Sequence, residues 1–342
     1  MKAVVYHSLN DVRIEEVAKP KISADEILVE MKACGVCGSD LMGWYLEKRA
    51  PLVLGHEPSG IVAEVGSNVE DFSEGDRVFA HHHVACLTCH YCRNTAYTMC
   101  EKFHNTHLHP GGFAEYFRVP EDNLRIDTLK IPENVSFEHA TLIEPVACGI
   151  RAVTKCGIHQ EDTVAIFGAG PAGVISVALT RLSGASQIVV GDLIDFRLKA
   201  AKKFGADMAV NVQKENFIEI VKSATQGRGA DVVIVTAPST KAYDSALEVC
   251  RKGGTICVFA PTSPEQTVPI SPHKLFFQEI KLIPSYSTSH LETRTALEMI
   301  RNGKIDAKGL ITRRFPLSNA QEAFNTAAHD KDCLKVVIFN EK

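Results

Sequence analysis

The chain has 342 residues, 45% hydrophobic and 23% charged, values typical of a globular protein with about two domains of ordinary size. A formal net charge of −4 argues against a nucleic-acid partner, and no apolar run approaches the roughly 18–20 residues of a membrane-spanning helix. The first residues lack the apolar stretch of a secretory signal. We therefore expect a cytoplasmic protein whose 11 cysteines form no disulfides, with five of them binding metal and the other six being buried thiols.

Short strands separated by turns are predicted for the first 145 residues. The segments 27–33, 59–66 and 75–80 are rich in β-branched and apolar residues, and Gly and Pro dominate the connections between them. This spacing predicts an all-β, barrel-like domain over residues 1–145.

Three separate fragments of this part of the chain suggest an open metal site. Cys37 lies in Gly-Val-Cys-Gly-Ser-Asp, His56 and Glu57 lie in Gly-His-Glu-Pro, and Glu144 precedes a proline. A mixed set of Cys, His and carboxylate is typical of a catalytic zinc, which keeps one coordination position for water or substrate. Each fragment alone is weak, because a single Cys is more often a small buried hydrophobe.

Four cysteines within fifteen residues form the second candidate metal site. Cys86, Cys89, Cys92 and Cys100 offer the soft ligands that a tetrahedral zinc prefers, and a closed all-Cys set would be structural. The alternatives are a disulfide pair or buried thiols. The histidine stretches 81–83 and 104–109 flank this lobe, and we interpret them as surface-loop residues without a metal.

From residue 163 the pattern changes to short apolar strands alternating with amphipathic helices, which predicts a doubly wound parallel sheet over residues 146–285. The first strand, 164–167, leads directly into a glycine-rich loop that opens a helix, the context required of a dinucleotide-binding G-x-G-x-x-G motif. The residues expected to bind the cofactor here are Gly168, Gly170, Pro171, Ala172 and Gly173.

Asp192 ends the next predicted strand, at the distance from the loop where an acidic side chain binds the adenosine ribose hydroxyls. Its charge would repel a 2′-phosphate, so NAD is expected rather than NADP. Arg197 either packs beside the adenosine or is a solvated helix residue. The tail alternates differently, with helices predicted over 291–302 and 319–328 and a strand over 335–338.

Taken together, these motifs resemble the zinc-containing alcohol dehydrogenases of the medium-chain dehydrogenase/reductase superfamily. The resemblance covers essentially the whole chain, and Glu144-Pro145 makes it most similar to the sorbitol, threonine and polyol dehydrogenase branch. It implies a GroES-like β-barrel catalytic domain, completed by residues 286–342, together with a Rossmann domain. It also implies a homodimer or homotetramer.

The resemblance also implies roles for individual residues. Cys37 and His56 would be ligands of the catalytic zinc, while Glu57 and Glu144 would share or exchange the carboxylate position. Ser39 would bond the reacting alcohol, and Asp40 would orient the ligand histidine. Met42 stands where many relatives carry the histidine that ends the proton relay. Trp44 and Tyr45 either line the substrate site or only pack their loop.

The sequence thus predicts an α/β, two-domain enzyme with two zinc ions per chain, one catalytic and one structural. It would transfer hydride between NAD and a small-molecule secondary alcohol or polyol, or the corresponding ketone. A sugar-alcohol-phosphate dehydrogenase is the first alternative. A zinc-free quinone or enoyl reductase, or a non-enzymatic binding protein, is disfavoured because the metal-ligand residues and Asp192 are all present.

Overall fold

The computed structural model describes residues 1–341, and the chain divides into two compact units. The first unit comprises residues 1–147 and 287–342, and the second comprises residues 148–286. The predicted boundaries lay at 145/146 and 285/286.

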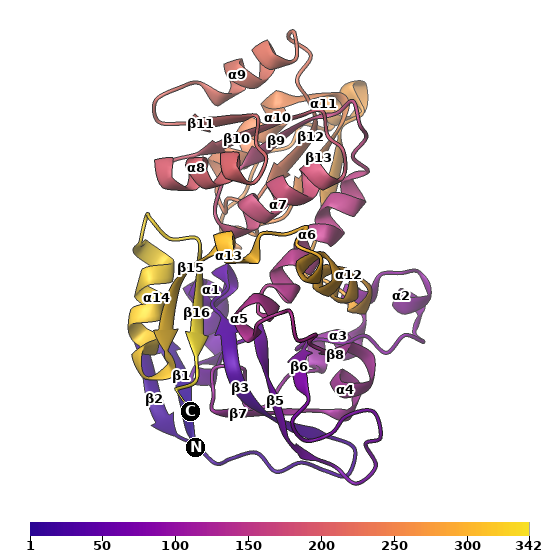
Figure 1. The fold of residues 1–342 in the computed structure, drawn as a ribbon. Helices are drawn as coiled ribbons and strands as arrows, with labels where there is room; N and C mark the ends of the chain where they lie inside the picture. The colour runs from indigo at the N-terminus through magenta and orange to yellow at the C-terminus, as the bar shows by residue number, and fades with distance from the viewer. Residues whose placement is uncertain (342) are drawn as a thin grey trace. The chain divides into compact units, whose positions relative to one another are not determined.

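The first unit is built mainly from antiparallel strands (Figure 1). Its strands are β1 Lys2–Ser8, β2 Asp11–Glu16, β3 Ile27–Gly35, β4 Leu52–Val53, β5 Pro58–Val65, β6 Arg77–Ala80, β7 Tyr116–Val119, β8 Thr128–Lys130, β15 Ile311–Pro316 and β16 Lys335–Phe339. A seven-stranded sheet has the order β15-β16-β3-β5-β6-β8, with β7 also paired to β3, and a smaller sheet has the order β2-β1-β4.

Helices and short 3₁₀ segments connect these strands. They are η1 Gly38–Leu41, α1 Gly43–Leu46, η2 Glu47–Arg49, α2 His90–Arg93, η3 Tyr97–Met99, α3 Glu101–Asn105, α4 Glu121–Asp127, α5 Phe137–Ala140, α6 Ile143–Cys156, α12 His290–Arg301, α13 Ala307–Leu310, η4 Leu317–Asn319 and α14 Ala320–His329. The all-β prediction for residues 1–145 missed α4 and the short helices near the cysteine lobe. The last strand, β16, lies against β3 although some 300 residues separate them, with Ile338 opposite Cys34.

The core of the first unit lies between these two sheets and α14. Its fully buried members include Tyr6, Met31, Phe113, Phe117 and Phe324. Strand β3 is buried over most of its length, whereas buried and partly exposed residues alternate along β7.

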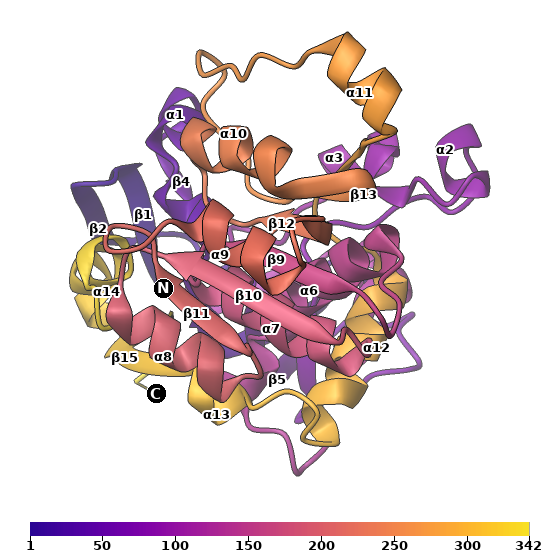
Figure 2. The same ribbon diagram turned by 90° about the horizontal axis from the view of Figure 1, so that it is seen from above.

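The second unit is a six-stranded parallel sheet with helices on both faces (Figure 2). Its elements are β9 Thr163–Phe167, α7 Pro171–Leu182, β10 Gln187–Asp192, α8 Asp195–Lys203, β11 Met208–Asn211, α9 Phe217–Ala224, β12 Ala230–Val235, α10 Thr240–Val249, β13 Cys250–Val258, α11 Pro272–Gln278 and β14 Lys281–Pro284. Helices α7 and α8 pack together on one face, and α9 and α10 on the other.

The strand order β11-β10-β9-β12-β13-β14 places β9 where the order reverses. Ligands of open α/β sheets bind outside the carboxyl ends of the strands at this position. The near-continuous apolar strands that predicted this sheet are buried on both faces, Val164, Ile166 and Val233 among them. Of the helices in the described part of the chain, none has the length and apolar composition to cross a membrane.

Candidate active site and cofactor-binding loop

Three predicted zinc ligands converge in the first unit. Cys37 follows β3, and His56 and Glu57 immediately precede β5. Because β3 and β5 pair antiparallel, with Cys34 opposite Pro58, the end of one strand lies beside the start of the other. One ligand atom from each of Cys37, His56 and Glu57 lies within 4.8 Å of the others. Residues distant in the sequence thus bring together one sulfur, one nitrogen and one oxygen ligand atom, a set that suits a catalytic zinc.

Asp40 holds two of these ligands in place. Its Oδ2 accepts a hydrogen bond from the backbone N–H of Cys37 at 2.9 Å, and its Oδ1 lies 3.4 Å from Nδ1 of His56. The contact at Nδ1 leaves Nε2 of the ring as the metal-binding atom. Burial opposes the charged imidazole, but Asp40 and the Cys37 thiolate outweigh it and raise the pKa of His56 well above its ordinary value. Zinc must therefore displace a proton from His56.

Glu57 has a partner that sequence reasoning missed, Lys335 at the start of β16. The Lys335 ammonium donates a hydrogen bond to Oε1 of Glu57 at 2.6 Å and lies 2.5 Å from Oε2. Both side chains are buried and the ammonium contacts both carboxylate oxygens, so a metal at this site would share Glu57 with Lys335. Burial raises the pKa of Glu57, while Lys335 acts in the opposite direction. The only sequence signal for this ion pair was a lysine at the first position of an apolar strand.

Gly35, the last residue of β3, makes room for this pair. A β-carbon at position 35 would lie 1.9 Å from Oε2 of Glu57 and 2.9 Å from the Lys335 side chain. Glu144, at the start of α6, is also buried, but it lies outside the donor set that Cys37 and His56 share. Its charge raises the pKa of Glu57, which indicates that the two carboxylates are near one another.

Ser39 and Met42 lie on η1 and at its end, two and five residues beyond Cys37. Ser39 is partly accessible, as a group that meets a substrate must be. Trp44 and Tyr45 on α1 pack edge-to-face with ring centroids 5.8 Å apart, and both are more than one-third exposed. Arg49 covers the Tyr45 ring.

The four-cysteine lobe has the geometry that a closed tetrahedral zinc site requires. The Cys89 and Cys92 sulfurs lie 3.5 Å apart and those of Cys86 and Cys92 lie 3.9 Å apart, close to the ~3.8 Å edge of a tetrahedron with 2.3 Å zinc–sulfur bonds. None of the four forms a disulfide. The hydroxyl and N–H of Thr88 and the N–H of Cys89 lower the pKa of Cys86 to about 5, as suits a thiolate ligand.

The glycine-rich loop of the second unit also fits its predicted ligand. Gly168 has φ +100°, and a β-carbon at Gly173 would lie 2.0 Å from the carbonyl oxygen of Gly168, so both positions require glycine. A β-carbon at Gly170 would meet nothing within 4 Å, which leaves open space beside the N-terminus of α7. Pro171 is the first residue of that helix, followed by Ala172. A pyrophosphate at this N-terminus would meet free N–H groups.

Asp192 ends β10, beside β9, and its carboxylate is fixed by the loop. Oδ2 accepts from the N–H of Ala169 at 2.6 Å and Oδ1 from the N–H of Ile194 at 2.9 Å. Arg197, on α8, is partly buried, and its Nε has no hydrogen-bond partner among the described residues. Both side chains thus belong to the same end of the sheet as the glycine loop.

Comparison with known proteins identifies the family of this chain. Residues 23–133 match the alcohol dehydrogenase GroES-like domain, and residues 171–302 match the zinc-binding dehydrogenase family. The chain is 34% identical to sorbitol dehydrogenase of Bacillus subtilis (strain 168), covering 99% of this chain and 97% of that protein. The chain belongs to the zinc-dependent alcohol dehydrogenase family. It is also 34% identical to L-idonate 5-dehydrogenase of Vitis vinifera, over 96% of this chain and 92% of that one.

Among solved structures, a zinc-binding dehydrogenase from Sinorhizobium meliloti 1021 bound to NADP superposes on this dehydrogenase with a TM-score of 0.88. The two are 29% identical, and the match covers 99% of this chain and 98% of that one. The predicted family, polyol dehydrogenase branch, fold class and enzyme class are confirmed. The cofactor classes, zinc and a nicotinamide dinucleotide, are confirmed as well.

Proposed function

We propose that this dehydrogenase oxidises a secondary alcohol of a polyol with NAD and reduces the corresponding ketone. The convergence of Cys37, His56 and Glu57, with Asp40 behind the histidine, is the observation that carries the proposal. Two relatives are named for sorbitol and L-idonate, which are polyhydroxylated compounds. A sugar-alcohol phosphate is the alternative to be tested alongside.

The residues divide the work as follows. Zinc and the nicotinamide, when bound, supply Lewis acidity and a hydride acceptor. Cys37 and His56 hold the metal, and Glu57 or Glu144 completes the set. The Ser39 hydroxyl takes the proton of the reacting alcohol and passes it outward. Its route ends in water or another group, because Met42 cannot transfer a proton.

In the resting state we assign the third position to Glu57 rather than Glu144. Glu57 lies with Cys37 and His56 in one donor set, and Glu144 lies outside that set. Lys335 opposes this assignment by holding the same carboxylate, so Glu57 is shared between metal and ammonium. Cys86, Cys89, Cys92 and Cys100 would hold a separate, structural zinc.

The second unit would bind NAD through Gly168, Gly170, Pro171, Ala172, Gly173, Asp192 and Arg197. The fixed Asp192 carboxylate favours NAD, because it would repel the 2′-phosphate of NADP. We further propose that residues 1–145 with 286–342 form the catalytic domain and residues 146–285 the NAD-binding domain. A homodimer or homotetramer in the cytoplasm completes the proposal.

The decisive experiment is a screen of NAD and NADP reduction with sorbitol, xylitol, L-idonate, threonine, simple secondary alcohols and sugar-alcohol phosphates. Zinc-loaded protein is compared with Cys37→Ser protein of measured zinc content. We expect the highest kcat/KM for an unphosphorylated polyol with NAD, and no activity after Cys37→Ser. A preference for phosphorylated substrates or for NADP would contradict the proposal.

A further inference from the structure

His82 lies beside the proposed catalytic metal site. It follows β6, and β5 pairs antiparallel with β6, so the end of β6 lies next to His56 at the start of β5. The ring centroids of His82 and His56 are 5.0 Å apart. All of these residues belong to the first unit. The interpretation of the 81–83 stretch as surface-loop residues is wrong for His81, which is fully buried.

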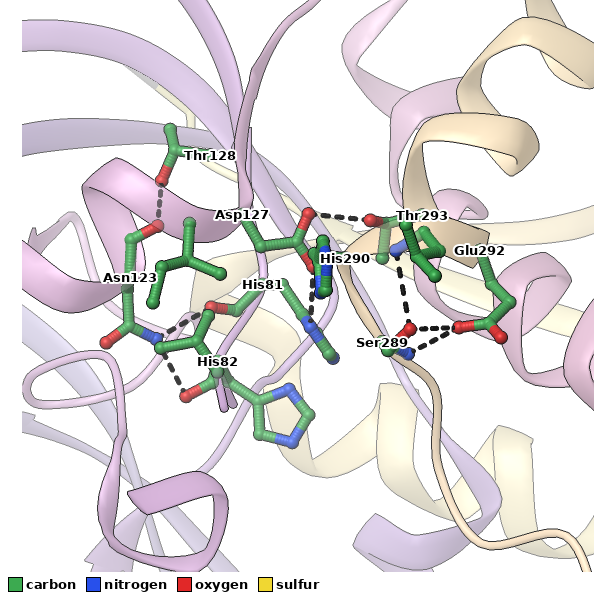
Figure 3. Close-up of polar contacts among 12 residues, drawn as sticks. His81, His82, Asn123, Asp127, Thr128, Ser289, His290, Glu292 and Thr293 are labelled. Atoms are coloured by element: carbon green, nitrogen blue, oxygen red, sulfur yellow. Dashed lines mark hydrogen bonds and ion pairs between the residues drawn. The ribbon is translucent and has the colours of Figure 1, made fainter. Parts of the chain in front are cut away.

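The backbone on either side of His82 is fixed. The side-chain amide of Asn123, on α4, donates hydrogen bonds to the carbonyl oxygens of His81 at 2.9 Å and of His82 at 3.0 Å. The buried ring of His81 donates from Nδ1 to Asp127 at 2.9 Å. Asp127 in turn accepts a hydrogen bond from Thr293 of α12 at 2.6 Å. Figure 3 shows this network and the His82 ring extending away from the two carbonyl contacts.

The orientation of the His82 ring is fixed by its neighbours. The His83 ring lies 3.9 Å away between centroids, and the His81 ring stands nearly perpendicular at 5.1 Å. His83 is itself held by a hydrogen bond from its Nδ1 to the carbonyl oxygen of Thr106 at 2.7 Å. The imidazole of His82 is thus placed beside His56 without any polar contact of its own.

Nδ1 of His82 is buried and has no hydrogen-bond partner among the described residues, although the residue as a whole is partly exposed. The ring therefore has hydrogen-bonding capacity that the chain itself does not use, and a hydroxyl group from outside the chain could use it. A neutral imidazole offers one donor and one acceptor, the complement of a hydroxyl group.

We propose that His82 binds the hydroxyl adjacent to the reacting carbinol and so makes this enzyme selective for vicinal diols over simple secondary alcohols. The inference rests on the proposed function, because it assumes that the reacting alcohol meets the metal held by Cys37 and His56. Asn123 and Asp127 are positioning residues, since they act through the backbone and ring of the histidine run.

The test compares 2,3-butanediol with 2-butanol, two substrates that differ by one adjacent hydroxyl. In His82→Phe we expect kcat/KM for the diol to fall about 10- to 100-fold, with 2-butanol unchanged or improved. His82→Gln, which keeps a donor and an acceptor, should retain much of the preference. Isothermal titration of the enzyme–NADH complex should show the same loss of diol affinity in His82→Phe, independently of turnover.

The control is His329→Phe, which makes the same substitution at an exposed histidine of α14. Zinc content and thermal midpoint are measured for every variant. The inference is overturned if the wild-type enzyme is active and both His82 variants have the same ratio of diol to monoalcohol kcat/KM as the wild type. The proposed function would then remain intact. The proposed function is overturned if the wild-type enzyme oxidises no alcohol. The titration then tests His82 alone, and equal diol affinity in the wild type and His82→Phe would overturn the inference as well.

Discussion

Replacing Lys335 by Met tests the buried Glu57–Lys335 pair. The ammonium contacts both oxygens of a fully buried carboxylate, and no other cation is bonded to Glu57 in the described structure. Removing one partner of a buried ion pair leaves an uncompensated charge and costs about 3–5 kcal/mol. Here the remaining charge would also face Glu144 and the Cys37 thiolate.

For a unit of about 200 residues, this loss lowers the thermal midpoint by roughly 6–20 °C. The assay is thermal unfolding of protein whose catalytic site has been emptied by chelation, because a zinc ion on Glu57 would itself compensate the carboxylate. It is applied to Lys335→Met, Glu57→Gln and the double variant. The double variant should recover much of the loss, because it removes both charges. Lys19→Met, which breaks the exposed pair with Glu64, should cost at most about 1 kcal/mol.

A midpoint for Lys335→Met no lower than that of Lys19→Met, both measured without zinc in the catalytic site, would refute this reasoning. So would additive effects of the two single variants, since a real pair must show a coupling energy in the double-mutant cycle. Either result would mean that the buried charges are solvated in a way that the structure does not show.

The remaining predictions concern chemistry, cofactor choice, acid stability and metal content. Ser39→Ala should lower kcat/KM about 10²–10⁴-fold at full zinc occupancy, whereas Met42→Ala should act only through packing; near-normal turnover of Ser39→Ala at all pH values would show another proton route. Asp192→Gly should narrow the NAD preference in kcat/KM by weakening NAD and relieving repulsion of NADP; equal use of both cofactors by the unmodified enzyme would contradict the assignment. Burial lowers the pKa of His83 to about 3, so the unfolded state binds a proton at this residue more tightly than the folded state does. The contribution of His83 to the free energy of unfolding is therefore complete above about pH 6.5 and falls by about 2 kcal/mol at pH 5. In His83→Phe, the thermal midpoint should depend less on pH over this range. Elemental analysis should find two zinc ions per chain, with chelation removing the open-site ion first; one zinc in active protein would exclude the two-site assignment.

The sequence predicted best those elements whose pattern is local. The strand at 164–167, the helix that follows the glycine loop and the aspartate at the end of the next strand are read directly from apolar runs and turn residues. The family motifs likewise named Cys37 and His56. The structure adds that strand pairing brings their ligand atoms together.

What the sequence could not provide depends on contacts between distant segments. Lys335 reaches Glu57 across 278 positions, and Thr293 reaches Asp127 across 166. No spacing rule links such residues, because only the packing of β16 and α12 places them. Helix α4 was missed as well, since it is a single short element between two strands. The polar residues that position His82 lie on this helix.

The Glu57–Lys335 pair also sets an order of events during synthesis. Residues are added at about 5–20 per second and domains generally fold as units from the N-terminus. The second unit, residues 148–286, is complete on the ribosome before Lys335 has been made. Until then Glu57 has no counter-ion, and β3 lacks the strand that will pair with its end at Ala33–Gly35. The parallel sheet of the second unit can therefore mature first, whereas the proposed metal site is finished only when the last strand joins the first unit.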